Sequence, residues 1–150
     1  MKKIAVAFTG PSNSGKTTLI TKIAEILIQE YQVAIIKNDP KDKAKFDTEG
    51  KDSYKFAQTG AETVVVSPTR TTYFSKKSRS LEELITMLGD FEILLVEGLK
   101  TLPLPRIAIF REKIDESYFE SSNAIAIDES VDITQYKIPS TIDLLDLNNP

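Results

Sequence analysis

A segment near the N-terminus combines the residue types that proteins use to bind phosphate groups. Two glycines, Gly10 and Gly15, permit the tight backbone path that turns successive N–H groups inward as an anion nest. The side chain of Lys16 would then reach the β- and γ-phosphates of a nucleotide, and the hydroxyl of Thr17 would bind Mg²⁺. The whole segment satisfies the pattern G-x-x-x-x-G-K-[ST] and comprises Gly10, Pro11, Ser12, Asn13, Ser14, Gly15, Lys16, Thr17 and Thr18. It predicts a nucleoside-triphosphate site, and the alternative is a chance turn rich in glycine and serine.

Two carboxylates are candidates to complete this site. Glu97 follows the apolar run 93–96, and a strand there would place it at the carboxyl end of a sheet, where ligands collect in open α/β folds. Glu97 could hold Mg²⁺ through a water or polarise an attacking water, so it joins Lys16 as a candidate catalytic residue; the alternative is a solvated acid at a strand end. Asp47 is either a second metal ligand, on a mobile loop that senses the γ-phosphate, or a structural residue. Because Mg²⁺ needs only one or two protein carboxylates beside phosphates and water, the expected metal ligands are Thr17, Asp47 and Glu97.

Other polar residues each have two interpretations. A lysine-rich stretch either contacts an anionic ligand, with its first lysine in the nucleotide site, or forms a solvated loop; its members are Lys37, Lys41, Lys43 and Lys45. A second group either faces the ligand or caps the helix that follows; it consists of Lys51, Asp52 and Ser53. The choice between an anion contact and a solvated loop also applies to the cations around the proline-containing loop 102–105, which are Lys100, Arg106 and Arg111.

Short apolar runs and helical patterns alternate along the chain. Unbroken runs rich in Val and Ile are typical of strands covered on both faces, and they occupy 4–8, 33–36, 64–66, 93–96, 107–110 and 124–127. The clearest helix spans 17–30, where apolar residues recur at i, i+3, i+4 and i+7. A second covers 80–88 and opens with a capping box at Ser80, and a weaker one covers 51–58. The strand before and the helix after residues 10–18 favour a phosphate loop over a chance turn.

This alternation predicts one α/β domain over residues 1–150. Parallel strands joined by right-handed crossovers would form three layers, a mostly parallel sheet with helices on both faces. The segment 64–75 is an exception, because two short β patterns around a Ser-Pro turn indicate an antiparallel hairpin or edge excursion. The acidic tail 141–150 is expected to pack only loosely.

Composition excludes several kinds of chemistry and partner. The chain of 150 residues has no His and no Cys, so it lacks an imidazole base, a thiolate nucleophile, a disulfide and a His/Cys zinc site. A net charge of −3 gives no overall basic footprint for nucleic acid or an anionic membrane. The first apolar run ends at Phe8, too early for a signal peptide, and no run approaches the ~20 residues of a membrane span. We therefore expect a cytoplasmic location without nucleic-acid or membrane partners.

Two further segments discriminate between protein families better than the widely shared phosphate loop does. They are Phe46-Asp47-Thr48-Glu49-Gly50-Lys51-Asp52-Ser53 and Leu95-Val96-Glu97-Gly98-Leu99-Lys100. With these patterns in these positions, the chain resembles the molybdopterin-guanine dinucleotide biosynthesis adaptor proteins, the MobB family. Other matching segments are 10–19, 33–37, 60–61 and 105–107, so the resemblance covers most of residues 4–111 in order.

The resemblance implies a homodimeric GTP-binding protein with the three-layer fold of P-loop NTPases and at most slow, Mg²⁺-dependent GTP hydrolysis. Its principal role would be that of an adaptor, which assists the MobA-type guanylyltransferase that joins GMP to molybdopterin and could contact molybdopterin itself. Carried over by position, residues 10–18 would cradle the phosphates, and Mg²⁺ would be surrounded by Thr17, Asp47 and Glu97. The ligand-facing loop would include Lys51, Asp52 and Ser53.

The sequence departs from the family at one point and leaves other functions open. Family members usually carry histidines after the Ile-Lys pair, whereas Ile36-Lys37 is followed here by Asn-Asp-Pro-Lys. Any role of those imidazoles in anion or pterin contact is therefore either lost in this chain or taken over by lysines. No N-K-x-D segment is present, and a preference for GTP over ATP therefore rests on the resemblance. A small-molecule P-loop kinase would need an arginine-bearing lid, but the arginines are dispersed as Arg70, Arg79, Arg106 and Arg111. An NTPase of the metal-insertion or partitioning type would differ in its protein partner.

Overall fold

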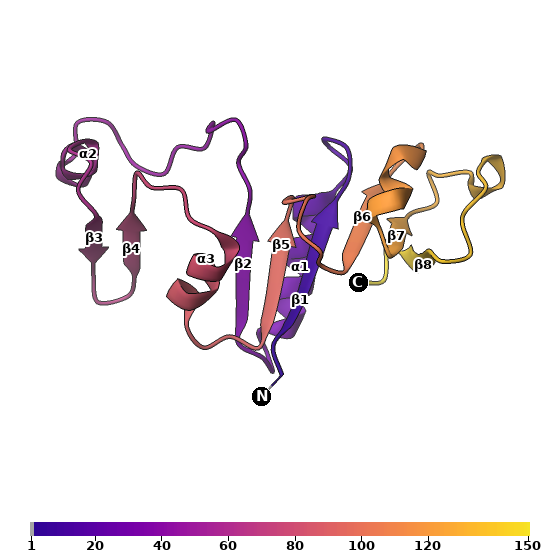
Figure 1. The fold of residues 1–150 in the computed structure, drawn as a ribbon, viewed down its shortest axis with the longest axis horizontal. Coiled ribbons are helices and arrows are strands. Elements are labelled where there is room, and N and C mark those ends of the chain that lie inside the picture. The colour runs from indigo at the N-terminus through magenta and orange to yellow at the C-terminus, as the bar shows by residue number, and fades with distance from the viewer. Residues whose placement is uncertain (1) are drawn as a thin grey trace. The chain divides into compact units, whose positions relative to one another are not determined.

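The computed structural model describes residues 2–150, which form two compact units (Figure 1). The first, here called the sheet unit, contains the chain up to Asn38 together with Asp90–Pro150. The second, the hairpin unit, is Asp39–Gly89. That both belong to one domain over residues 1–150 stays a prediction from the sequence. No helix within residues 2–150 has the length and apolar composition required to cross a bilayer.

The sheet unit is built on a six-stranded parallel sheet in the order β2-β5-β1-β6-β7-β8. Its strands are β1 (Ile4–Thr9), β2 (Val33–Lys37), β5 (Ile93–Glu97), β6 (Arg106–Phe110), β7 (Ala124–Ile127) and β8 (Asp143–Asp146). The helix α1 (Lys16–Leu27) joins β1 to β2, and two short 3-10 helices, η1 (Glu116–Ser121) and η2 (Ile133–Gln135), follow β6 and β7. Together with the hairpin described below, this confirms the predicted α/β class and its mostly parallel sheet.

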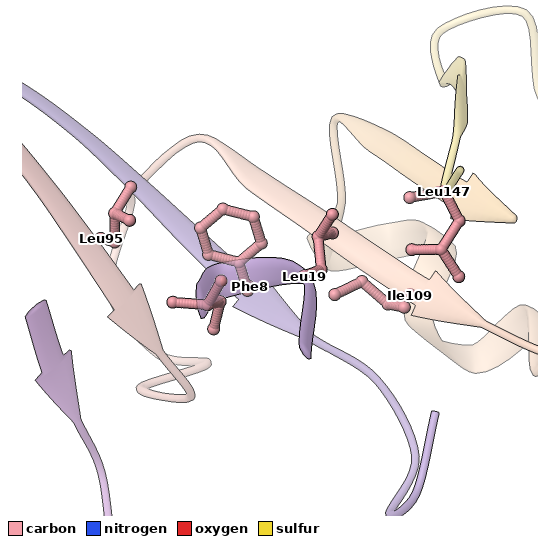
Figure 2. Close-up of a cluster of buried hydrophobic side chains, with 7 residues drawn as sticks. Phe8, Leu19, Leu95, Ile109 and Leu147 are labelled. Carbon is pink, nitrogen blue, oxygen red and sulfur yellow. The ribbon is translucent and has the colours of Figure 1, made fainter. Parts of the chain in front are cut away.

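The central strands of this sheet are covered on both faces, which explains why β5, β6 and β7 contain continuous apolar runs. Along β6, Ile109 packs with Phe8, Leu95 and Leu147 beneath Leu19 of α1, as Figure 2 shows. The intervening Phe110 points to the opposite face because successive side chains of a strand alternate. There it joins a second cluster to which η1 and η2 contribute, including Ala108, Ile125, Ile142, Tyr118, Phe119 and Ile133.

The C-terminal tail is ordered, so the prediction that 141–150 would pack loosely is wrong. Its residues Asp143–Asp146 pair in parallel with β7 as strand β8, in the register Ile125↔Leu144. Ile142 and Leu147 on either side are buried and anchor the strand in the two clusters. Two leucines between aspartates are too short a pattern to predict a strand, and its stability comes from these flanking residues and from backbone pairing with β7.

The hairpin unit contains α2 (Asp52–Gln58), β3 (Thr63–Val66), β4 (Thr71–Phe74) and α3 (Leu81–Leu88). β3 and β4 pair antiparallel from Thr63↔Phe74 to Val66↔Thr71, which confirms the predicted hairpin. Ser80 and Glu83 form the predicted capping box at the start of α3. Glu62, next to the hairpin, accepts hydrogen bonds from Tyr73, Ser75 and Arg79.

Arg106 holds the connection between β5 and β6 in place. Its side chain is buried, and its guanidinium donates to the carbonyl oxygens of Gly98, Leu99 and Leu102 at 2.9, 3.0 and 3.0 Å. Leu99 has a φ of 52°, an uncommon backbone conformation for a branched residue, and this bond to its carbonyl supports it. Both interpretations of Arg106, as a solvated residue or as an anion ligand, are therefore wrong, because its side chain is buried and its guanidinium donates to three backbone oxygens.

We expect Arg106→Met to lower the free energy of unfolding by about 2–5 kcal/mol, since three part-buried carbonyl groups lose a charged donor. Urea denaturation measures this change. Arg70→Met, in the exposed hairpin turn, is the matched control and should stay within about 0.5 kcal/mol of the parent protein. A parent-like midpoint for Arg106→Met would show that water satisfies these carbonyls equally well.

Candidate functional site

The segment between β1 and α1 has the backbone of an anion nest. Gly10 and Gly15 adopt φ values of 145° and 96°, and Asn13 adopts 60°. A Cβ atom on Gly10 would lie 2.5 Å from the carbonyl oxygen of Ile109, so only glycine fits between this loop and β6. A Cβ on Gly15 would lie 3.2 Å from the guanidinium of Arg111.

Lys16 folds back over this loop. Its ammonium donates to the carbonyl oxygens of Gly10 at 2.9 Å and Pro11 at 2.7 Å. Burial lowers the pKa of Lys16, and the carboxylate of Glu97 partly opposes that shift. The cation is therefore partly desolvated beside the loop, where a phosphate oxygen would be a stronger partner than a peptide carbonyl.

Two further features of the loop leave donors available to an anion. The N-cap of α1 is Gly15, so no side chain caps the helix, and its first turn contains no acidic residue. The N–H groups and positive dipole end of this turn therefore have no side-chain cap. Ser14 is buried, and its Oγ has no hydrogen-bond partner among the residues that the structure describes. Thr17 and Thr18 are exposed on the same turn, while Leu19 and Ile20 anchor the helix in the core.

Glu97 lies at the same edge of the sheet. As the last residue of β5 it pairs in register with Phe8 at the end of β1 and with Lys37 at the end of β2. Its Oε2 is 3.1 Å from the Lys37 ammonium, and the Glu97 side chain is 18% exposed. The structure therefore brings Lys16, Lys37 and Glu97 together, with Lys37 bonded to the carboxylate.

The remaining predicted residues belong to the hairpin unit. Asp47 accepts hydrogen bonds at Oδ1 from the Thr48 N–H at 2.8 Å and the Ser53 hydroxyl at 3.2 Å. Its Oδ2 is buried and has no hydrogen-bond partner within the described part of the chain. The N-cap of α2 is Lys51, without a side-chain capping bond, and Asp52 follows it as an exposed residue. Ser53 therefore does not cap α2, and its hydroxyl instead donates a hydrogen bond to Asp47.

The sequence interpretation missed Asp128. It follows β7 directly, as Glu97 ends β5, and its Oδ2 lies 3.3 Å from the Nε of Arg111. The rule that selected Glu97, a carboxylate at the carboxyl end of a buried strand, would also have selected Asp128. Arg111, for which the sequence allows either an anion contact or a solvated position, lies between this carboxylate and Gly15 of the phosphate loop.

Comparison with known proteins gives a consistent family. The family model described as molybdopterin guanine dinucleotide synthesis protein B, MobB, matches residues 5–129. The molybdopterin-guanine dinucleotide biosynthesis adapter protein of Haemophilus influenzae is 30% identical over 151 residues, which cover 95% of this chain and 81% of that protein. A Methanocaldococcus jannaschii protein described as a putative adapter protein of the same kind is 28% identical over 130 residues. Those residues are 83% of this chain and 54% of its relative, so the chain spans about half the length of that protein.

The fold has solved counterparts as well. The crystal structure of Bacillus subtilis MobB aligns with a TM-score of 0.78 and 24% identity, covering 98% of this chain and 91% of the other. This similarity shows the three-layer P-loop NTPase fold that the phosphate loop and the parallel sheet indicated. On the extent of the family match and on the identity with the Haemophilus relative, the chain belongs to the MobB family.

Proposed function

We propose that this protein is a nucleotide-dependent adaptor of molybdenum cofactor biosynthesis. It binds GTP with Mg²⁺ and assists the MobA-type guanylyltransferase that converts molybdopterin to molybdopterin guanine dinucleotide. The observation that carries nucleotide binding is the phosphate loop, with Lys16 resting on two of its own carbonyls and the α1 N-terminus uncapped. The adapter names of the relatives support the cellular role.

The nucleotide-binding residues are those of the loop and its surroundings. The backbone N–H groups of residues 10–18 and the Ser14 hydroxyl would bind phosphate oxygens, which would also draw Lys16 from its carbonyl partners. Lys37 would contribute positive charge beside Glu97. Lys51, Asp52 and Ser53 are assigned to the ligand-facing loop on the family resemblance.

The donor set also fits a magnesium ion. Hydroxyl and carboxylate oxygens are the ligands that Mg²⁺ prefers, and Thr17, Glu97 and Asp47 supply them. The unpartnered Oδ2 of Asp47 is the observation that favours its part in metal binding. Bound Mg²⁺ would neutralise charge on the β- and γ-phosphate oxygens. Oε2 of Glu97 accepts from the Lys37 ammonium, which leaves Oε1 for Mg²⁺ or for a water.

A homodimer in the cytoplasm completes the proposal. The β3–β4 hairpin exposes a row of apolar side chains, with Val64 58% and Val66 74% exposed. A two-stranded hairpin is only marginally stable without further packing, so a contact that covers these valines would stabilise it. This supports a role of the hairpin unit in association between copies of the chain.

The nucleotide site is tested by unfolding with and without ligand. With GTP and Mg²⁺ at 100 times the dissociation constant, the parent protein should gain about 2.7 kcal/mol of stability. Lys16→Ala should gain little, because the phosphates lose their ammonium contact, whereas Lys22→Ala on the exposed face of α1 should respond like the parent. Equal responses of Lys16→Ala and the parent would contradict the assignment.

The metal ligands are tested through the magnesium dependence of GTP affinity. Thr17→Ala and Glu97→Gln each remove an oxygen ligand or its charge, so the affinity gained on adding Mg²⁺ should fall by roughly tenfold or more. Titration with a fluorescent GTP analogue at several Mg²⁺ concentrations measures the effect. Thr21→Ala, one turn further along α1, is the control. The metal assignment is wrong if both variants keep the parent's dependence.

The adaptor role is tested by reconstituting dinucleotide formation from molybdopterin, GTP and purified guanylyltransferase. The parent protein should bind the enzyme and increase the yield, and Lys16→Ala should increase it less. Neither binding nor stimulation by the parent would favour another NTPase function on the same fold.

A further inference from the structure

Lys100 lies in the loop that joins β5 to β6, and this loop passes directly beside β1. The two strands flank β1 on opposite sides (Figure 1), so their connection has to pass it. At the start of the loop, the Gly98 N–H donates to the carbonyl oxygen of Phe8 at 3.0 Å. At its end, the carbonyl oxygen of Pro105 accepts from the Ala7 N–H at 2.8 Å. Both ends of the loop are therefore tied to the residues that lead into the phosphate loop.

The backbone around Lys100 is held in place, whereas its side chain is not. Leu99, just before it, has a φ of 52°, and its carbonyl oxygen accepts from the guanidinium of Arg106 at 3.0 Å. The same guanidinium donates to the carbonyl oxygens of Gly98 and Leu102, on either side of Lys100. The Lys100 side chain is exposed and ends a flexible four-carbon stem. Its ammonium can therefore change partners without a movement of the loop.

The partner of the Lys100 ammonium in this structure is an aromatic ring. The ammonium lies 4.4 Å from the centre of the Tyr118 ring in η1, and no carboxylate within residues 2–150 is at ion-pair distance from it. Tyr118 is half-buried and packs edge-to-face on Phe110, with the ring centroids 5.6 Å apart. A ring attracts an exposed cation less strongly than a phosphate that accepts a hydrogen bond from it. Lys100 would therefore leave the ring for a phosphate within reach.

Lys100 also belongs to a group of like charges around the phosphate loop. Burial lowers the pKa of Lys16 most, and Glu97 opposes that shift. The positive charges of Lys100 and Lys37 lower the pKa of Lys16 further, so both lie near enough to repel its ammonium. Because Lys37 is paired with Glu97 at 3.1 Å, the unpaired positive charge is that of Lys16 and Lys100. A bound polyanion would relieve the repulsion between them.

We propose that Lys100 binds the terminal phosphate of the nucleotide and thereby distinguishes a triphosphate from a diphosphate. The inference rests on the proposed function and assigns a residue outside the phosphate loop. The backbone of such a loop cradles the α- and β-phosphates, which leaves the γ-phosphate to side chains of neighbouring loops. The loop of Lys100 starts directly after Glu97, a proposed ligand of the Mg²⁺ that bridges the β- and γ-phosphates. When Lys100 donates to the γ-phosphate, its ammonium leaves the Tyr118 ring.

A purely structural role for Lys100, as a cover for the Tyr118 ring, is the competing explanation. The chain contains a matched control, because the ammonium of Lys3 lies 4.3 Å from the centre of the Phe91 ring. Lys3 precedes β1 and the phosphate loop follows it, so this second pair lies at the opposite edge of the sheet. Substitution by Met leaves an apolar side chain on the ring at both positions and removes the charge.

The test compares dissociation constants of GDP and of the β,γ-imido analogue of GTP, both with Mg²⁺. The proteins are the parent, Lys100→Met, Lys100→Arg and Lys3→Met. The parent should bind the triphosphate more tightly than GDP. Lys100→Met should lose roughly 10- to 150-fold in affinity for the triphosphate, since one charged donor is removed, and about twofold or less for GDP. Lys100→Arg keeps the cation and should restore most of the difference, and Lys3→Met should bind like the parent.

A second measurement follows the Tyr118 ring itself. The chain has five tyrosines and no tryptophan, so labelling with fluorotyrosine gives a small set of fluorine resonances, and Tyr118→Phe identifies the relevant one. The triphosphate analogue should shift this resonance in the parent and in Lys3→Met, because the cation leaves the ring, and GDP should not. In Lys100→Met, neither nucleotide should shift it.

The outcomes separate this inference from the proposed function. A selective loss of triphosphate affinity in Lys100→Met, restored by arginine and accompanied in the parent by the shift of the Tyr118 resonance, supports the assignment. Equal losses for both nucleotides, no loss, or an unmoved Tyr118 resonance overturns it, and nucleotide binding stands. If the parent binds GDP and the triphosphate equally, the assignment also fails. If the parent binds neither nucleotide, the proposed function fails and the assignment with it.

Discussion

The close approach of Gly10 to Ile109 connects the phosphate loop to the sheet. Because no side chain fits between the loop and the carbonyl oxygen of Ile109, β1 and β6 come together with the loop directly above their ends. Every other part of the site depends on that position. The end of β5 brings Glu97 from one side of β1, and the end of β6 brings Arg111 from the other.

Charge in this site is arranged without histidine or cysteine. The carboxylate of Glu97 bonds to Lys37, and that of Asp128 bonds to Arg111, so an ion pair lies on either side of β1. Lys16, between them, has peptide carbonyls as its partners. Hydrogen bonds from an ammonium to a carbonyl are weaker than those to a phosphate. The Lys16 ammonium can therefore exchange its carbonyl partners for a phosphate when an anion binds.

The sequence predicted the elements whose signals are local. The phosphate loop, the buried strands, the capping box at Ser80 and the hairpin each depend on neighbouring residues, and the structure contains them. Contacts that need the strand order could not be predicted. Lys37 lies beside Glu97 only because β2 and β5 pair in that register. The structural role of Arg106 could not be predicted either, because its three carbonyl partners in the preceding loop are known only from the structure. The nucleotide-binding roles of individual residues stay predictions.

The strand β8 has a consequence for the behaviour of the folded protein in solution. It is the last strand in the sheet order, so one side of its backbone has no paired neighbour in the described sheet, and Leu144 and Leu145 are 53% and 41% exposed. An exposed apolar edge strand is a template on which a second chain can add. Asp143 and Asp146 enclose the two leucines and place negative charge at both ends of the strand. The acidic residues of this tail thus act as gatekeepers against edge-to-edge aggregation.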